Sequence, residues 1–268
     1  MRRVVAACLM VLIALPVWAN ARHTVLMDVL EIRQLSGILH TEGLNFGATL
    51  DREWLDGQGG AAWQQQVARI YDAERIHEAI RAGVEPALQG DLLEETITFF
   101  ATDAGRRIIM LENSARAALA DPDVEQAARD RFAALQGSDP RLARIERMID
   151  AGDLINRNVT SALNSNYQFL RALVDGGVYD MTDTEILDDV MSERENIALD
   201  TEAWLGAFML LAYSPLDADA LETYVRFSES SAGTALNAGL FAGFDPLYED
   251  ISYALGRAMA LNMAAEEL

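Results

Sequence analysis

The chain has 268 residues, of which 51% are hydrophobic, and it carries 42 acidic against 21 basic side chains, a formal net charge of −21. This length and hydrophobic content are enough for a packed core, which excludes a disordered chain. The negative charge repels nucleic-acid phosphates and anionic lipid head groups, so we expect no nucleic-acid partner. A well-solvated surface is the simplest interpretation of the charge, with a cationic partner or loosely bound divalent ions as the alternative.

The first 21 residues have the pattern of a secretory signal peptide. A basic pair at 2–3 precedes an apolar run at 4–16, and small residues form a cleavage motif that ends at Ala19 or Ala21. The apolar run is shorter than the roughly 20 residues that a membrane-spanning helix needs, although a retained N-terminal anchor is an alternative. We therefore expect cleavage near Ala19 or Ala21, a periplasmic mature protein, and no stable membrane span after cleavage.

The single cysteine, Cys8, lies inside this signal. Too few residues precede it for the apolar run of a lipoprotein box. The mature chain would therefore have no thiol for a disulfide, for thiolate catalysis or for a cysteine-based metal site.

Helical periodicity dominates the rest of the chain, because apolar residues return every three or four positions and strand-like alternation is almost absent. The pattern predicts an all-α fold, a multi-helix bundle built from two related helical halves with no significant β-sheet. The expected helices cover about 24–40, 62–84, 91–101, 103–119, 123–136, 140–175 with Gly152 as a candidate break, 183–191, 194–213, 219–229, 231–243 and 246–264.

Local signals support several helix starts. Thr182 and Glu185 have the spacing of a capping box, and Asp245 followed by Pro246 places a cap before a proline at a first helical position. We therefore expect helices to begin at both places.

Glycine-rich stretches predict loops at 57–60, 137–140 and 176–177. The middle one is the predicted internal boundary. It divides the mature chain into a first helical repeat at 22–137 and a second at 138–268, and the two halves either form separate units or pack as one globular domain.

The two halves share a phrase. Residues 91–105 align with 219–233 without a gap, at an offset of 128 positions (219 − 91), and six of the fifteen aligned positions are identical. The match indicates an internal duplication. In both copies we expect an aspartate, Asp91 or Asp219, to cap a first helix while Glu94 or Glu222 reaches back to it.

A second helix should follow each first one after a tight corner. Thr102 and Ser230 are the expected caps, and Gly105 and Gly233 fall at the third helical position. Glycine costs roughly 1 kcal/mol in a helix relative to alanine, so its presence at both places predicts a neighbouring backbone too close for a β-carbon. We therefore expect the shared phrase to have a structural role, as two helices joined by a tight corner.

Four segments carry a resemblance: AAWQQQVARIYD, FFATDAGRRI, LAYSPLDADALETYVRFSESSAG and ALNAGLFAGFDPLYEDISYALGRA. Together they resemble a family of exported bacterial helical proteins catalogued as domain of unknown function 2059, here in tandem, divergent copies. That family has an aromatic-x-Ser-Pro-x-Gly turn, for which this chain has Thr102, Asp103 and Gly105 in one copy and Ser230, Ser231 and Gly233 in the other. The proline is replaced in both copies, so we expect a softer turn. The resemblance implies an α-helical envelope protein without an assigned activity and carries over no catalytic residue.

Of the three histidines, His23, His40 and His77, the last has a suggestive neighbour. Glu74 and His77 have the Glu-x-x-His spacing of di-iron bundles, but no second such pair occurs. His77 also falls on an apolar stripe, which favours a hydrogen-bonded core or boundary histidine, with a metal ligand as the alternative.

Motifs for catalysis are missing from the sequence. It contains no G-x-S-x-G elbow and no H-E-x-x-H helix, and adjacent acids such as Asp188 and Asp189 are expected by chance in so acidic a chain. We therefore assign no catalytic residue, no cofactor-binding residue and no metal ligand, and we expect a protein that is not an enzyme; a carboxylate-metal enzyme is the minor alternative.

Small residues recur every fourth position at Ala235, Gly239 and Gly243. The surrounding apolar stretch is too short to span a membrane, so the spacing predicts close helix packing inside a bundle. Five aromatic residues are expected as core or boundary anchors, with a ligand pocket lined by them as the alternative: Trp54, Trp63, Trp204, Tyr213 and Tyr224.

These patterns predict an exported, non-enzymatic periplasmic helical protein with a role in envelope maintenance or protein–protein interaction. Its expected partner is an unknown envelope protein or a second copy of the chain, and no cofactor is expected. The alternative is a helical binder of a small apolar or lipid-like ligand held between the two halves.

Overall fold

The computed structural model describes residues 21–135 and 139–266. The predicted signal therefore lies outside the described residues except for Ala21, and so do residues 137 and 138 of the predicted boundary at 137–140. A short helical segment at 21–29 precedes the first long helix.

The predicted all-α fold is confirmed, since no strand occurs in the residues described. The helices are α2 Ile32–Trp54, α3 Gly60–Ile70, α4 Ala73–Ala87, α5 Gly90–Phe100, α6 Asp103–Leu119, α7 Pro122–Leu135, α8 Pro140–Gly152, α9 Leu154–Asp175, α10 Asp183–Ser192, α11 Arg194–Tyr213, α12 Ala218–Ser228 and α13 Ser231–Glu266.

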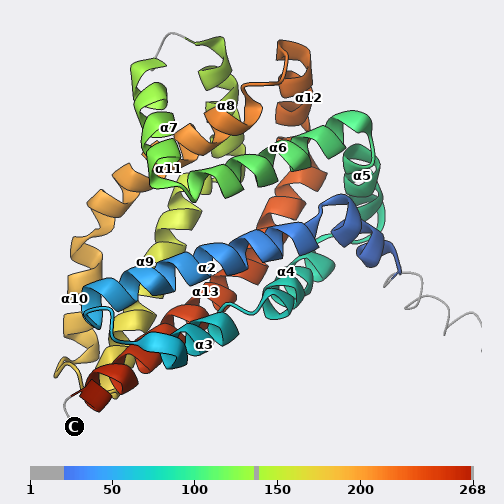
Figure 1. Ribbon diagram of the computed structural model, residues 1–268. Helices are drawn as coiled ribbons and strands as arrows, with labels where there is room; N and C mark the ends of the chain where they lie inside the picture. The colour runs from blue at the N-terminus through green and yellow to red at the C-terminus, as the bar shows by residue number, and fades with distance from the viewer. Residues whose placement is uncertain (1–20, 136–138, 267–268) are drawn as a thin grey trace, which may run out of the picture.

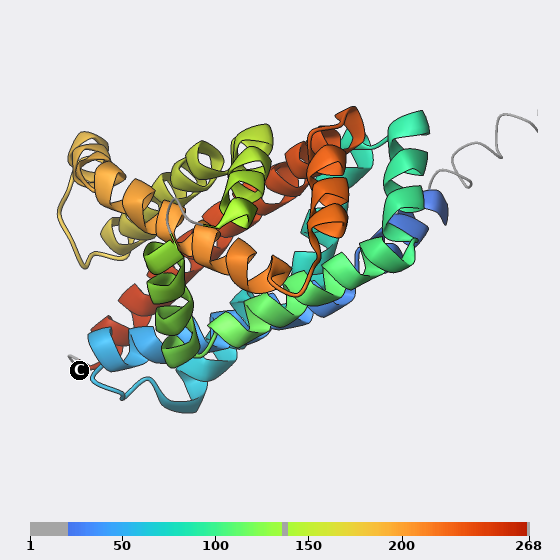
Figure 2. The same ribbon diagram turned by 90° about the horizontal axis from the view of Figure 1, so that it is seen from above.

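The longest helix, α13, organises the molecule (Figure 1). It packs along α9 and α4, while α11 packs against α6, α7 and α9. Viewed from above, α13 runs diagonally through the length of the bundle, and α11 and α12 cross in front of it (Figure 2). Helices from before and after the predicted boundary therefore pack on one another, α4 on α13 and α11 on α6 and α7.

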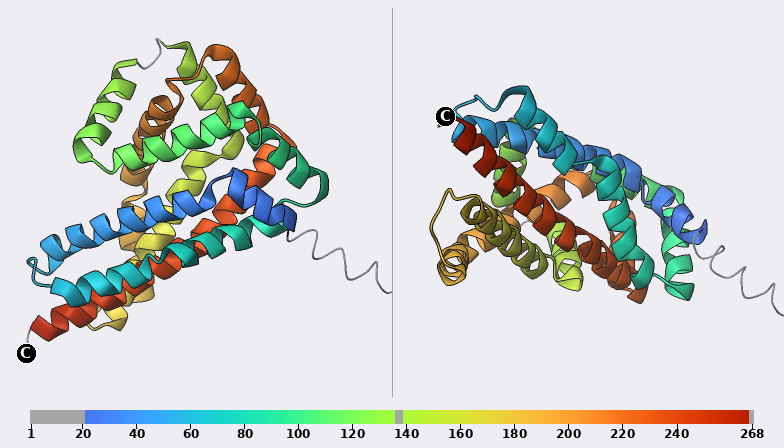
Figure 3. Two further views of the ribbon diagram at one scale, coloured as in Figure 1. Left: turned by 45° about the vertical axis from the view of Figure 1, so that its right-hand side comes forward. Right: turned by 90° about the horizontal axis from the view of Figure 1, so that it is seen from below.

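Helix α6 crosses the molecule between two groups of helices. In the left view of Figure 3, α6 lies between α7, α8 and α12 on one side and α2, α3 and α4 on the other. The described part of the chain contains no helix that is both long enough and apolar enough to cross a membrane.

Several predicted helices have the bounds expected from local signals. The helices at 103–119 and 194–213 are confirmed, and the capping box of Thr182 and Glu185 begins α10. The candidate break near Gly152 is also confirmed, because Asp153 has a left-handed φ of 49° between α8 and α9.

The predicted end of the first helix near residue 40 was wrong. α2 continues to Trp54 because Gly43 and Gly47, which weaken a helix in isolation, make room for side chains that pack across it. A β-carbon on Gly43 would lie 2.1 Å from the ring of Tyr71, and one on Gly47 would lie 2.5 Å from Val67.

The single helix predicted over 62–84 was also wrong, since α3 ends at Ile70 and α4 begins at Ala73. Asp72 between them has extended backbone, and its side chain accepts a hydrogen bond from the amide of Arg75 at 2.9 Å. This N-cap begins a new helix at a place where the spacing of apolar residues alone predicts a single continuous helix.

The helix start predicted at Asp245 and Pro246 was also wrong. Here the prediction divided one helix into two, because both residues lie inside the continuous α13. A proline inside a helix costs about 3 kcal/mol. The helix continues because its contacts with α9 and α4 lie on both sides of the proline, and Leu247 and Ile251 are buried directly after it.

Close packing through small residues is confirmed, with α4 as the partner. A β-carbon on Gly83 would lie 2.2 Å from the backbone nitrogen of Gly243, and one on Gly243 would lie 2.6 Å from the carbonyl oxygen of Ala79. The two helices therefore approach until their backbones touch, which only glycine permits.

Both predicted corners have the expected geometry. The Thr102 hydroxyl accepts a hydrogen bond from the Gly105 amide at 3.0 Å, and the Ser230 hydroxyl accepts one from Gly233 at 3.1 Å. A β-carbon on Gly105 would lie 2.3 Å from the carbonyl oxygen of Phe99. The close backbone is thus the last turn of the preceding helix.

The predicted caps of the first helices, Asp91 and Asp219, were wrong. Asp217 caps α12 by accepting a hydrogen bond from the Ala220 amide at 2.8 Å, and Gln89, before α5, makes no side-chain cap. The glutamates expected to reach back form ion pairs instead, Glu94 with Arg22 and Glu222 with Arg144 and Arg147.

Candidate ligand-binding cavity

A cavity of 220 Å³ lies among α6, α8, α9, α11, α12 and α13. Its lining is mostly apolar and includes Leu154, Leu205, Phe208, Met209, Leu236 and Leu240. The carboxylate of Glu112 and the rings of Tyr213 and Tyr224 complete one side. An apolar space with a few convergent polar groups is the usual form of a small-molecule site in a protein.

The break between α8 and α9 shapes one wall of this cavity. Gly152 ends α8, and its carbonyl oxygen accepts a hydrogen bond from the side-chain amide of Asn237 on α13 at 2.9 Å. A β-carbon on Gly152 would lie 2.9 Å from that amide nitrogen, so glycine allows α13 to approach the break. Gly152 and Asn237 both line the cavity.

Glu112 reaches the cavity from α6. The hydroxyl of Tyr213, at the end of α11, donates to Glu112 Oε1 at 2.6 Å, and the hydroxyl of Tyr224, on α12, donates to the same oxygen at 2.8 Å. Three helices therefore converge on one carboxylate oxygen.

The other carboxylate oxygen, Oε2, has a different environment. Within the described residues it accepts no hydrogen bond, and Glu112 forms no ion pair. The side chain is half-buried and faces the cavity. Oε2 is thus an acceptor that remains available to a ligand or to water.

Burial sets the acidity of these groups. It raises the pKa of Glu112 above the ordinary glutamate value, and the two tyrosine hydrogen bonds offset part of that rise. Burial and the Glu112 charge raise the pKa values of Tyr213 and Tyr224 well above the ordinary tyrosine value. Both phenols therefore remain protonated and act as donors.

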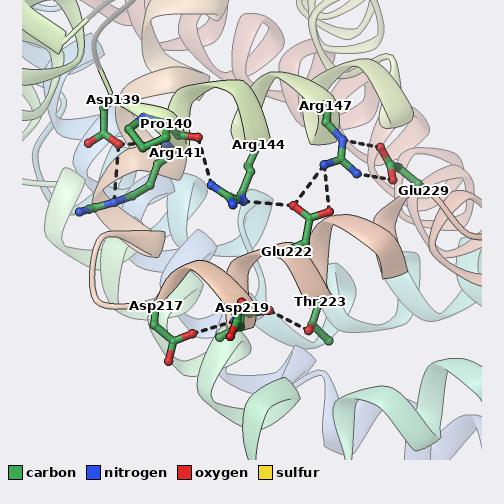
Figure 4. Close-up of polar contacts among 11 residues, drawn as sticks. Asp139, Pro140, Arg141, Arg144, Arg147, Asp217, Asp219, Glu222, Thr223 and Glu229 are labelled. Atoms are coloured by element: carbon green, nitrogen blue, oxygen red, sulfur yellow. Dashed lines mark hydrogen bonds and ion pairs between the residues drawn. The ribbon is translucent and has the colours of Figure 1, made fainter.

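Ion pairs on the outer surface hold two walls of the cavity together (Figure 4). On α8, Arg144 contacts Glu222 of α12 at 3.1 Å, while Arg147 contacts Glu222 at 3.0 Å and Glu229 at 2.8 Å. Hydrogen bonds from Arg147 lower the pKa of both glutamates. The network fixes α8 against α12, and both helices line the cavity.

His77, the candidate metal ligand, is buried on α4, as its place on the apolar stripe predicts. Its Nδ1 has no hydrogen-bond partner in the part of the chain that the structure describes. The carboxylate of Glu74 points elsewhere and pairs with Arg33 at 3.1 Å on the surface. Among the described residues, no group of three histidine, aspartate or glutamate side chains is placed to hold a metal ion.

The five aromatic residues divide between core and cavity. Trp63 is buried and donates from its ring nitrogen to the Gly47 carbonyl at 2.8 Å, as expected of a core anchor. Trp54 packs edge-on against Phe169, and Trp204 stacks on Phe208. Tyr213 and Tyr224 line the cavity, which was the alternative considered for them.

Glu112 was missed by sequence reasoning. Its position in the sequence could have identified it, because it falls on the inward-facing stripe of α6 together with Ile108, Ala115 and Leu119. A carboxylate at such a position is costly unless it has partners or a function.

Comparisons of the chain with family models, with curated proteins and with solved structures gave no match. The chemistry of the cavity is therefore the basis on which a function is proposed.

Proposed function

We propose that this chain is an exported helical protein that binds one small, mostly apolar molecule in the cavity at Glu112. The observation that carries the proposal is an apolar cavity with one carboxylate oxygen left for a ligand. Small-molecule sites combine these two features, since the apolar lining supplies affinity and the polar group orients the ligand.

The size of the cavity limits the ligand. A cavity of about 150 Å³ takes benzene, so 220 Å³ has room for about nine non-hydrogen atoms. This volume supports a single-ring compound or a short hydrocarbon chain with one polar group.

The position of the cavity agrees with a ligand held between the two halves. Glu112 comes from the first half, and the other lining residues come from the second. Among the described residues that line the cavity, Glu112 is the only one with a carboxylate. Export and an envelope location rest on the signal pattern at 1–21 and on the resemblance to domain of unknown function 2059.

We also infer that the halves descend from a duplication. The equivalent caps at Thr102 and Ser230, with the same bond to the third helical amide, support this origin. Domain of unknown function 2059 in two divergent copies is the corresponding family proposal.

Native mass spectrometry of gently purified protein tests the binding function. We expect a retained small mass, or a one-to-one adduct when 2-phenylethanol is added as a neutral probe. Leu236→Trp, which places a large ring in the cavity, should abolish the adduct, whereas Leu199→Trp on the exposed face of α11 should not. A bare chain that takes up no probe would contradict the proposal.

A protein-interaction role is the second candidate, and one surface favours it. A groove between α9 and α10 is lined in part by Leu187 and Met191, which are 51% and 46% exposed. Exposed apolar side chains beside a groove are a feature of association sites. Sedimentation analysis would support self-association if the chain is a dimer that Leu187→Ser dissociates; a monomer at high concentration would contradict it.

A further inference from the structure

We propose that the ligand of this cavity is a small organic amine, bound as its ammonium ion. Its nitrogen would contact Oε2 of Glu112, and its hydrocarbon part would lie among the apolar side chains of α11 and α13. This inference rests on the proposed binding function and specifies the class of ligand.

Within the part of the chain that the structure describes, the Glu112 carboxylate has one oxygen with hydrogen-bond donors and one without. Oε1 of Glu112 already accepts hydrogen bonds from Tyr213 and Tyr224, so a ligand must address Oε2. An acceptor selects a donor, and a half-buried carboxylate without an ion-pair partner selects a cationic donor most strongly. A neutral hydroxyl would satisfy the hydrogen bond but not the charge, and a carboxylate ligand would be repelled.

Aromatic rings form part of the cavity wall. The rings of Phe208, Tyr213, Tyr224 and Phe227 line the cavity together with Glu112. The faces of aromatic rings attract ammonium groups, and this attraction strengthens away from water. One carboxylate and several rings around an apolar space therefore favour an amine with a hydrocarbon body.

The chain as a whole is strongly acidic. A net charge of −21 raises the local concentration of cations and lowers that of anions near the surface. The same field adsorbs amines on surface carboxylates, so the experiment must separate the cavity from the surface.

Calorimetric titration with matched probes tests the inference on the full chain. Phenethylamine, 2-phenylethanol and 3-phenylpropionate share one ring and differ in the charge of the head group. At neutral pH we expect the amine to bind about tenfold or more tightly than the alcohol, as charge-assisted hydrogen bonds allow, and the acid to bind more weakly than both.

The key variant is Glu112→Gln, which keeps the shape and an oxygen for the two tyrosines but removes the charge. We expect it to weaken phenethylamine about tenfold and to leave 2-phenylethanol within about threefold. Glu195→Gln, on the exposed surface of α11, removes the same charge elsewhere and should change neither. Circular dichroism and thermal melting establish that each variant is folded.

Each outcome has one meaning. If the alcohol binds as tightly as the amine, or if Glu112→Gln leaves amine binding unchanged, the amine class is overturned while the cavity remains a binding site. If no probe binds, the proposed function fails as well. If amine binding disappears at about 1 M salt, where the Debye length is about 3 Å, it is surface adsorption and the inference is overturned.

Discussion

Phe99 and Phe227 stack on each other with ring centroids 4.1 Å apart and planes 13° from parallel, although 128 positions (227 − 99) separate them in the chain. They are the same position of the shared phrase, one near the end of α5 and the other near the end of α12. The two helical corners therefore meet at these rings.

This contact predicts energetic coupling between the corners. We expect Phe227→Ala, at a buried ring, to lower the free energy of unfolding by about 3 kcal/mol, and Phe99→Ala, at a partly buried ring, to lower it by less. The double variant should lose about 1 kcal/mol less than the two single losses together, because the stacking is removed only once. Urea denaturation of the four proteins measures the coupling, and strict additivity would show that the rings do not interact.

The corner glycines should be intolerant of a methyl group. Gly105→Ala and Gly233→Ala would place a β-carbon 2.3 Å and 2.1 Å from backbone carbonyl oxygens, which cannot move aside cheaply. We expect each variant to lose about 1–3 kcal/mol of stability. Gly37→Ala is the matched control, since nothing lies within 4 Å of its added β-carbon, and it should gain about 0.5–1 kcal/mol. Melting curves in which all three glycines behave alike would contradict this explanation.

A partly buried ion pair joins α2 to α6. Arg116 contacts Glu42 through Nε and Nη2, both at 2.9 Å, and its guanidinium lies 5.9 Å from the centre of the Trp204 ring. Glu42→Ala leaves this cation without its partner, so we expect a loss of about 2–3 kcal/mol.

The exposed pair of Glu74 and Arg33 provides the control for Glu42. Glu74→Ala should change the free energy of unfolding by less than about 0.5 kcal/mol, because exposed ion pairs contribute little. Equal effects of the two substitutions in urea denaturation would mean that burial of the first pair is unimportant.

Acid should weaken the network that fixes α8 to α12. Arg147 lowers the pKa values of Glu222 and Glu229 in the folded state below their unfolded values. Their stabilising contribution is therefore complete above the ordinary glutamate pKa of about 4.3 and is lost as the pH falls through the lowered values. Arg147→Met should lose less stability than the wild type over that range, and an unchanged acid profile in thermal melts would contradict the role of Arg147.

Glu112 should show the opposite dependence. Its folded-state pKa is raised, so folding favours the protonated form, and stability from this group is lost as the pH rises through the raised value. Tyr213 and Tyr224, which face Glu112, stay protonated throughout this range. We expect Glu112→Gln to be more stable than the wild type at neutral pH and the difference to shrink on acidification. A variant less stable than the wild type at every pH would show that the ionised Glu112 carboxylate does not destabilise the folded protein.

Sequence reasoning predicted the elements whose determinants are local. Thr102, Ser230 and Thr182 cap helices with amides three residues ahead, and these helices begin where expected. It failed where the decisive contact comes from elsewhere in the chain. Gly43 and Gly47 lie in the middle of α2 because the side chains of Tyr71 and Val67 pack directly against them. Val67 belongs to α3, and Tyr71 is the residue after it.

The candidate site was also predictable only where its determinants are local. Tyr213 and Tyr224 were identifiable as aromatic anchors, but their hydroxyl partner is more than a hundred positions earlier, in α6. No local pattern connects Glu112 to them. The packing of α6 against α11 brings Tyr213 to Glu112, and Tyr224 reaches the same carboxylate from α12.

The location of bound phenethylamine tests the central claim most directly. A crystal structure of the complex should place the ammonium nitrogen within hydrogen-bond distance of Glu112 Oε2 and the phenyl ring near Leu205, Phe208 and Leu236. Amine molecules found only on surface carboxylates, with the cavity unchanged, would contradict it.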